Sequence, residues 1–91
     1  NFAINVAAES HVDRSFKNSL LFTRSNTLGA HTFVQSCIEN NVKKILQVST
    51  DEVYGQTLKG QKNEQSLMNP TNPYSASKAA AEIIINSYKF F

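Results

Sequence analysis

Residues 44–55, Lys-Ile-Leu-Gln-Val-Ser-Thr-Asp-Glu-Val-Tyr-Gly, place a short apolar run directly before small and acidic side chains. The run from Lys44 to Val48 has the length and composition of a strand. Phe2 to Val6 repeats this pattern at the start of the chain, where Phe-Ala-Ile-Asn-Val passes into Ala-Ala-Glu-Ser. Apolar runs of this kind are typical of buried parallel strands. We therefore predict two buried strands, residues 2–6 and 44–48.

A helix is predicted between the two strands and another near the end of the chain. From about Asn18 to Asn40, apolar residues recur at helical spacing before a polar stop. They are Leu21, Leu28, Phe33, Val34, Cys37 and Ile38. Pro73 suits the first turn of the last helix, which continues through residues 77–87.

The segment before that last helix, residues 56–72, is polar and indicates a long loop of the kind that often covers a site. The predicted order is therefore strand, helix, strand, loop, helix. Strands that alternate with helices imply a parallel sheet with right-handed connections. We predict an α/β fold.

Small and polar residues follow both predicted strands, Ala7 to Ser10 after the first and Ser49 to Glu52 after the second. Because ligands of open α/β sheets bind beyond the carboxyl ends of the strands, these segments are two candidate parts of one site. Asp51 and Glu52 could act there as an acid–base pair, since neighbouring carboxyl groups in different environments can divide these roles. From the residues alone, an exposed acidic turn is the simpler interpretation.

Tyr74 and Lys78 lie four residues apart at the start of the last helix, so their side chains share one face. An ammonium close to a phenol favours the phenolate, which can take a proton from a substrate hydroxyl. The spacing alone is a weak signal, because such pairs also arise by chance.

Composition restricts the class of protein. With 91 residues, 41% of them hydrophobic, 18% charged and a net charge of +2, the chain is typical of one small soluble globular domain. The charge is too low to predict nucleic-acid binding. There is no apolar run that would span a membrane and no signal peptide, which predicts a cytoplasmic protein.

Cysteine and histidine predict neither a disulfide nor a metal site. Cys37 is the single cysteine, which fits a reducing compartment, and its place on the apolar helix face indicates a core residue. His11 follows the first strand and His31 lies within the first helix, without further ligands at convincing spacing.

Three stretches together resemble a known family. They are Asn-Val-Ala-Ala-Glu-Ser-His-Val-Asp-Arg-Ser at 5–15, Val-Ser-Thr-Asp-Glu-Val-Tyr-Gly at 48–55 and Asn-Pro-Tyr-Ser-Ala-Ser-Lys at 72–78. In this order they resemble the extended short-chain dehydrogenases, and most closely the dTDP-glucose or UDP-glucose 4,6-dehydratases. The resemblance implies a Rossmann-type doubly wound parallel sheet, NAD as cofactor, a nucleotide-sugar substrate and a homodimer.

The resemblance also implies catalytic roles. Tyr74 would take the proton from the sugar 4-hydroxyl, Lys78 would hold the nicotinamide ribose, and Thr50 would hydrogen-bond the reacting oxygen. Glu52 would remove the C5 proton and Asp51 would protonate the departing 6-hydroxyl. The product would be a 4-keto-6-deoxy sugar nucleotide, of the kind used in rhamnose synthesis.

The remaining implied residues line the cofactor. They are Val6, Ala7, Ala8, Glu9 and Ser10 after the first strand, with Ser10 also near substrate, and Ser25 where the family usually has a threonine. The family's glycine-rich turn is expected before Asn1. We therefore expect residues 1–91 to be a fragment of a single NAD-binding Rossmann domain that is inactive alone and binds NAD poorly.

Three alternatives stay open. Epimerases that resemble UDP-galactose 4-epimerase keep the tyrosine and lysine but typically have small or apolar residues at the Asp51-Glu52 position. UDP-glucuronate decarboxylases usually have Ser-Glu there. The pair therefore favours dehydration over both. A non-catalytic truncated relative is the third alternative.

Overall fold

The computed structural model describes residues 1–55 and 65–89. Two strands, β1 (Phe2–Asn5) and β2 (Lys44–Gln47), pair in parallel, with Phe2 opposite Lys44 and Asn5 opposite Gln47. The segments between them are the helices α1 (Val12–Lys17) and α2 (Ser19–Phe22), the π-helix η1 (Thr23–Leu28) and the helix α3 (Gly29–Glu39). After β2 come the 3₁₀-helix η2 (Asp51–Tyr54) and the helix α4 (Pro73–Asn86). The parallel pairing confirms the predicted α/β fold.

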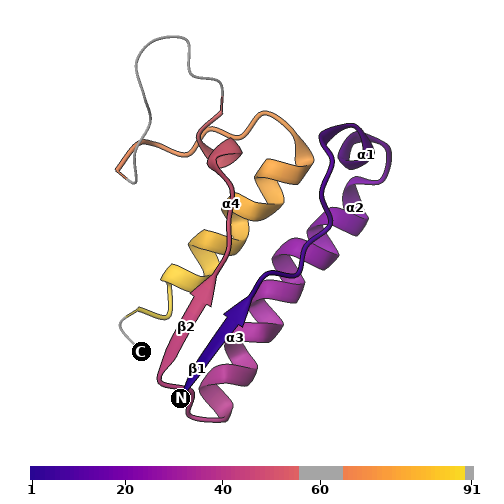
Figure 1. Cartoon of the computed structure of the whole chain (residues 1–91). Helices are drawn as coiled ribbons and strands as arrows, with labels where there is room; N and C mark the ends of the chain where they lie inside the picture. Colours follow the sequence, from indigo (N-terminus) through magenta and orange to yellow (C-terminus); the bar gives the residue numbers. More distant parts are fainter. Residues whose placement is uncertain (56–64, 90–91) are drawn as a thin grey trace.

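Both strands point toward the same end of the molecule, while α3 and α4 run back in the opposite direction (Figure 1). The carboxyl ends of the strands, η2, α1 and the first turn of α4 gather at that end (Figure 1). Ile45 of β2 lines a common cavity with Val34 of α3 and Ile85 of α4, so both helices cover the same face of the sheet. The two predicted site segments therefore lie side by side at one edge, as the sequence indicates.

The opposite face of the sheet is exposed in this chain, which corrects the prediction of buried strands. Phe2 is 58% exposed, Ile4 53% and Leu46 49%. The residues that alternate with them, Ala3 and Ile45, are half-buried. Since side chains of a strand alternate between its two faces, helices on one side cover only every second residue.

The predicted helix from Asn18 to Asn40 has the right bounds, since helical structure runs from Ser19 to Glu39, but the π-helical middle and the separate helix α1 before it were not predicted. Helical structure already begins at Val12, breaks at Asn18 (φ −143°, ψ 60°), and widens into the π-helix η1 before α3. The end is as predicted. Asn41 adopts φ 57°, and the N–H groups of Asn41 and Val42 donate to the carbonyls of Ile38 (3.1 Å) and Cys37 (2.9 Å), which closes α3 in a Schellman motif.

Helix α4 begins as its sequence predicts. The side chain of Asn72 accepts a hydrogen bond from the N–H of Ser75 at 2.9 Å, and Pro73 occupies the first turn. The small buried residues Ala79 and Ala81 let α4 pack closely on its neighbours. The rest of the buried apolar core is Phe22, Ala30, Val34, Cys37 and Val53, which confirms that Cys37 is a core residue.

Two further predictions concern segments outside this core. Of the predicted loop at 56–72, residues 56–64 lie outside the described residues. In the described part of the chain, no helix has the length and apolar character needed to cross a bilayer.

Candidate active site

Thr50 starts the acidic turn at the end of β2. Its backbone is extended, and its side-chain oxygen accepts a hydrogen bond from the N–H of Glu52 at 3.3 Å. This cap starts η2 and places Asp51 and Glu52 in its first turn, both exposed to solvent. The next residue, Val53, is buried and anchors the turn to the core. The two carboxylates therefore project from a fixed turn at the edge where the strands end.

Gly55 ends the acidic turn in a conformation that other residues rarely adopt. Its φ is 78°, and a Cβ at this position would collide with the carbonyl oxygen of Asn69. The N–H of Asn69 in turn donates to the carbonyl of Val53 at 2.8 Å. The segment that leaves η2 and the segment that leads to α4 are thus in direct contact.

Lys78 is a charged residue buried inside this end of the molecule. It is only 4% exposed, and its Nζ donates a hydrogen bond to the carbonyl of Val48 at 2.8 Å. Burial lowers the pKa of Lys78 below its ordinary value of 10.5, and the negative charge of Glu82 partly opposes this shift. The bond to Val48 fixes α4 to the end of β2, two residues before Thr50.

Tyr74 lies one helical turn before Lys78. It is half-buried, and its ring packs edge-on against Phe22, with the ring centroids 6.3 Å apart. The helix α4 also packs against η2. The structure therefore brings the helix that carries Tyr74 and Lys78 against the turn that carries Thr50, Asp51 and Glu52.

Asn26 joins three segments of the site and was missed by the sequence analysis. It is 2% exposed. Its Oδ1 accepts from the N–H of Glu9 at 2.8 Å, and its Nδ2 donates to the carbonyl of Glu9 at 2.9 Å and to the hydroxyl of Ser77 at 3.0 Å. The hydroxyl of Ser77 donates to the carbonyl of Tyr74 at 2.7 Å. The one signal in the sequence was the polar run Thr-Arg-Ser-Asn-Thr at 23–27, within an otherwise amphipathic helix.

The residues after β1 differ in how they are held. Glu9 is fixed by Asn26 through its backbone and pairs with Arg14 through its carboxylate at 3.3 Å. Ser25 is half-buried on η1, directly before Asn26. The other predicted residues of this segment are exposed; they are Val6, Ala7, Ala8 and Ser10.

The two histidines lie in different parts of the molecule. His11 is exposed, with φ 83°, and precedes α1. The Nε2 of His31 lies 2.9 Å from the hydroxyl of Tyr88. Within residues 1–55 and 65–89, no cluster of three or more His, Cys, Asp or Glu side chains could hold a metal ion.

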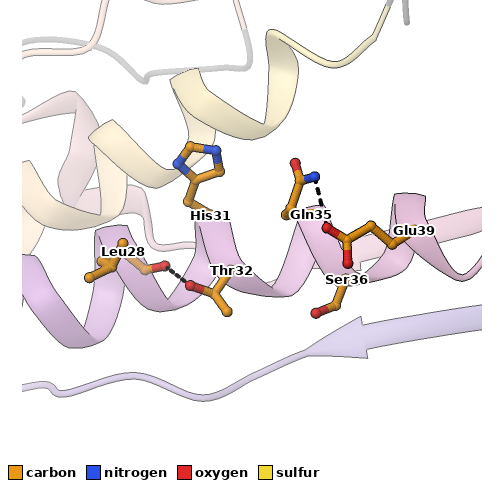
Figure 2. Close-up of a pocket in the computed structure, with 6 residues that line it drawn as sticks. All are labelled: Leu28, His31, Thr32, Gln35, Ser36 and Glu39. Carbon is orange, nitrogen blue, oxygen red and sulfur yellow. Dashed lines mark hydrogen bonds between the residues drawn. The ribbon is translucent and has the colours of Figure 1, made fainter.

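A separate groove runs along α3. Its volume is about 470 Å³, and it contains none of the predicted site residues. Its polar side chains bond along the helix, Thr32 to the carbonyl of Leu28 at 2.9 Å and Gln35 to Glu39 at 3.1 Å (Figure 2). The groove is lined by Leu28, His31, Thr32, Gln35, Ser36 and Glu39.

Comparison with known proteins decides the family. Residues 2–90 match the model of the family described as GDP-mannose 4,6 dehydratase. The chain belongs to this family. A dTDP-D-glucose 4,6-dehydratase of Dictyostelium discoideum is 46% identical over 99 residues, with 97% of this chain and 23% of the relative covered.

Two further similar proteins agree with membership of the GDP-mannose 4,6-dehydratase family. A trifunctional UDP-glucose 4,6-dehydratase, 3,5-epimerase and reductase of Arabidopsis thaliana is 44% identical over 90 residues, with 93% of this chain and 13% of that protein covered. The crystal structure of a dTDP-glucose 4,6-dehydratase from Streptomyces venezuelae, with NAD bound, superposes with a TM-score of 0.94 at 40% identity. It covers 97% of this chain and 27% of that one. The Rossmann-type fold is thereby confirmed, and the chain spans about a quarter or less of its curated relatives.

The side chains of this dehydratase-family segment fit a dinucleotide at the strand ends. Ala7 and Ala8 are small and exposed just after the carboxyl end of β1, so a ring of the dinucleotide can approach the backbone closely. Lys78 uses one of its three N–H donors on Val48, which leaves two for ribose hydroxyls.

Proposed function

We propose that the protein containing these residues is an NDP-glucose 4,6-dehydratase. It would convert dTDP-D-glucose or UDP-D-glucose to the 4-keto-6-deoxy sugar nucleotide with loss of water. The observation that carries the proposal is the Lys78–Val48 bond, which fixes the helix of Tyr74 and Lys78 against the Thr50-Asp51-Glu52 turn. Residues 1–91 would form part of a single NAD-binding Rossmann domain.

The proposed cofactor is NAD, which when bound would accept hydride from the sugar and later return it. Lys78 would donate to its ribose hydroxyls. The loop after β1 and the π-helix η1 would line its binding site through Val6, Ala7, Ala8, Glu9, Ser10 and Ser25. Asn26 supports this role, because it holds the backbone of Glu9 in one position.

The first chemical step would be oxidation at C4 of the sugar. Tyr74 would take the proton of the 4-hydroxyl, and the Lys78 ammonium would favour the phenolate that does so. The oxygen of Thr50 accepts from Glu52 N–H, so its own O–H is free to donate to the 4-oxygen of the substrate.

The second step would remove water. A ketone at C4 acidifies the proton at C5, which Glu52 would take as general base. Asp51 would protonate the leaving 6-hydroxyl as general acid. This assignment is supported by the position of the two carboxylates, which are neighbours on η2 and exposed after the end of β2.

The test is to incubate the full-length enzyme with NAD and dTDP-glucose or UDP-glucose, and to follow the nucleotide sugar by mass spectrometry. We expect a product lighter by one water, and the faster of the two substrates identifies the nucleotide. Glu52→Gln should stall before water loss, whereas Glu39→Gln, the same change at an exposed site on α3, should behave as wild type. Retained dehydration in Glu52→Gln would refute the assigned base. A 4-epimer of the same mass, separated by chromatography, or loss of CO2 from UDP-glucuronate supplied as a further substrate would support the alternative activities.

We further propose a homodimer formed through α3 and α4. A large apolar side chain is exposed at each helix, Leu28 at 56% in the last position of η1 directly before α3, and Ile83 at 62% on α4. Sedimentation of the full-length enzyme should give the mass of a dimer, and replacing both residues with glutamate should give a monomer. The low net charge of +2 makes nucleic acid an unsuitable partner.

We also propose that the enzyme works in the cytoplasm, in deoxysugar synthesis of the rhamnose type. The name of the Arabidopsis relative, which includes a rhamnose reductase, supports this pathway. Loss of 6-deoxy sugars from cell extracts after deletion of the gene would test it.

A further inference from the structure

Two side chains of α4 hold two consecutive residues after β2. Lys78 Nζ bonds the carbonyl of Val48 at 2.8 Å, and the hydroxyl of Ser49 donates a short hydrogen bond to a carboxylate oxygen of Glu82. Lys78 and Glu82 lie one helical turn apart, so they present neighbouring positions on one face of α4. The next residue after Ser49 is Thr50, which starts the acidic turn.

Glu82 does not face the strand-end edge of the site. Its carboxylate borders a cavity of about 250 Å³ between β2 and α4, together with Ile45, Gln47 and Ser49. Asp51 and Glu52, by contrast, are exposed beyond the strand. A sugar bound at that edge would therefore not touch Glu82, and any effect of Glu82 on the reaction would pass through other residues.

Lys78 lacks a direct ion pair within the described residues, although it is only 4% exposed. A buried ammonium without a nearby negative charge is unfavourable and tends to lose its proton. Glu82 is the charge in the described chain that counters this tendency, since it raises the pKa of Lys78 against the effect of burial. The elements packed against α4 carry other ionisable groups, which are Asp13, Arg14 and Lys17 on α1, Arg24 on η1, His31, Cys37 and Glu39 on α3, and Asp51, Glu52 and Tyr54 on η2.

We propose that Glu82 is a positioning residue of the dehydratase site, which holds the Ser49–Thr50 strand end against α4 and places a negative charge one helical turn from the buried ammonium of Lys78. The inference rests on the proposed function for the role of Lys78. A neutral amine at Lys78 would no longer favour the phenolate of Tyr74, so the loss of Glu82 would slow oxidation at C4 rather than weaken substrate binding.

Kinetics of the full-length enzyme test this role. Glu82→Gln keeps the size and an acceptor for Ser49 but removes the charge. We expect kcat to fall about tenfold, a part of the 100- to 10,000-fold that positioned acid–base groups contribute, with KM little changed. The basic limb of the pH–rate profile should move to lower pH, because Lys78 then loses its proton more readily.

Matched variants separate charge from packing. Glu82→Asp keeps the charge and should retain the wild-type basic limb, and Ser49→Ala should lower kcat without moving that limb. Glu39→Gln should match wild type in both measurements. A wild-type rate and pH profile in Glu82→Gln, or a displaced limb in Glu82→Asp, would overturn the proposal.

A titration that needs no activity distinguishes failure of this inference from failure of the proposed function. The pKa of Lys78 can be followed by NMR of ¹³Cε-labelled lysine, with Lys78→Met to assign the signal. It should be lower in Glu82→Gln than in wild type. If wild type dehydrates no sugar nucleotide, the proposed function fails while this comparison still decides whether Glu82 keeps Lys78 charged; equal pKa values would reject that role.

Discussion

Asn26 connects three segments of the chain through one buried side chain. Its amide fixes both backbone polar groups of Glu9 and the hydroxyl of Ser77. The partners lie 17 and 51 residues away in the sequence. Because every buried polar group needs a partner, removal of this amide would leave several groups unsatisfied at once.

Replacement of Asn26 by alanine should therefore destabilise the protein by about 2–4 kcal/mol, since each unsatisfied buried group costs about 1–3 kcal/mol. Chemical unfolding of the full-length enzyme measures this. Asn40→Ala is the matched control, because Asn40 makes one exposed bond to Ser36 and should cost under about 1 kcal/mol. Equal costs for the two variants would contradict the role of Asn26.

Lys78 is expected to trade stability for activity. Its folded pKa lies below the ordinary value of 10.5, so between these two values the unfolded chain binds more protons. Below the folded pKa, burial of the charged Lys78 lowers the stability of the folded protein by the full amount. This loss of stability decreases as the pH rises toward 10.5. Lys78→Met should therefore unfold at the same or a higher temperature than wild type near neutral pH, with the gain shrinking in alkaline buffer.

The same variant should lose catalysis by about 100-fold or more, because a methionine cannot support the phenolate of Tyr74. Thermal unfolding at two pH values and a dehydration assay check both halves of the prediction. The carbonyl of Val48 that loses the Lys78 bond still accepts a hydrogen bond from the side-chain amide of Gln47 at 3.2 Å. A Lys78→Met variant that is less stable than wild type at neutral pH would contradict this prediction.

At the level of secondary-structure elements, the sequence correctly predicted the apolar face of the helix before β2. It did not predict that a π-helix interrupts this helix. Apolar spacing correctly identified Val34 and Cys37 as core residues of α3. The π-helix η1 was not predicted, because it depends on Asn26, whose partners come from distant segments. π-turns of this kind occur frequently at functional sites, and here η1 connects the loop after β1 to α4.

The sequence likewise predicted one part of the candidate site and missed another. The strand-end rule and the motif placed Thr50, Tyr74 and Lys78 on the elements that the structure brings together. Ser49 was placed in a candidate segment, but its contact with Glu82 went unnoticed, because that contact joins positions 33 residues apart. Long-range polar contacts are the part of a site that a single sequence does not reveal.

The turn η2 supplies a prediction at this scale. Gly55→Ala should destabilise the protein by more than about 1 kcal/mol, because a Cβ would meet the carbonyl of Asn69 and the φ of 78° is unfavourable. The displaced turn should also lower the dehydration rate, since it carries Asp51 and Glu52. Gly29→Ala is the control, because its Cβ would have ordinary contacts within a helix. Unchanged stability and rate in Gly55→Ala would contradict the role of this turn.

At the scale of the whole molecule, the covered and exposed faces of the sheet differ sharply. Two helices pack on one face, whereas Phe2, Ile4 and Leu46 are exposed on the other. Both strands also have one unpaired edge among the described residues. Apolar surface of this kind next to open strand edges favours association with further chains.

The 91 residues expressed alone should therefore self-associate, and a Phe2→Thr, Leu46→Thr variant should do so less. Sedimentation across a range of concentrations measures this. Ala3→Thr adds a threonine on the covered face and should leave association unchanged while lowering stability. We also expect calorimetry to show no tight binding of NAD to the chain alone. A monomeric wild-type chain that binds NAD tightly would contradict both expectations.

The contact between Val53 and Asn69 also bears on how this family can diversify. Because the N–H of Asn69 meets the carbonyl of Val53, the two ends of the intervening segment are already together. Lengthening a closed loop costs little, about 0.6 kcal/mol for each doubling. Natural selection can thus change the number of residues in this segment at little cost in stability, while the contact at its two ends is kept.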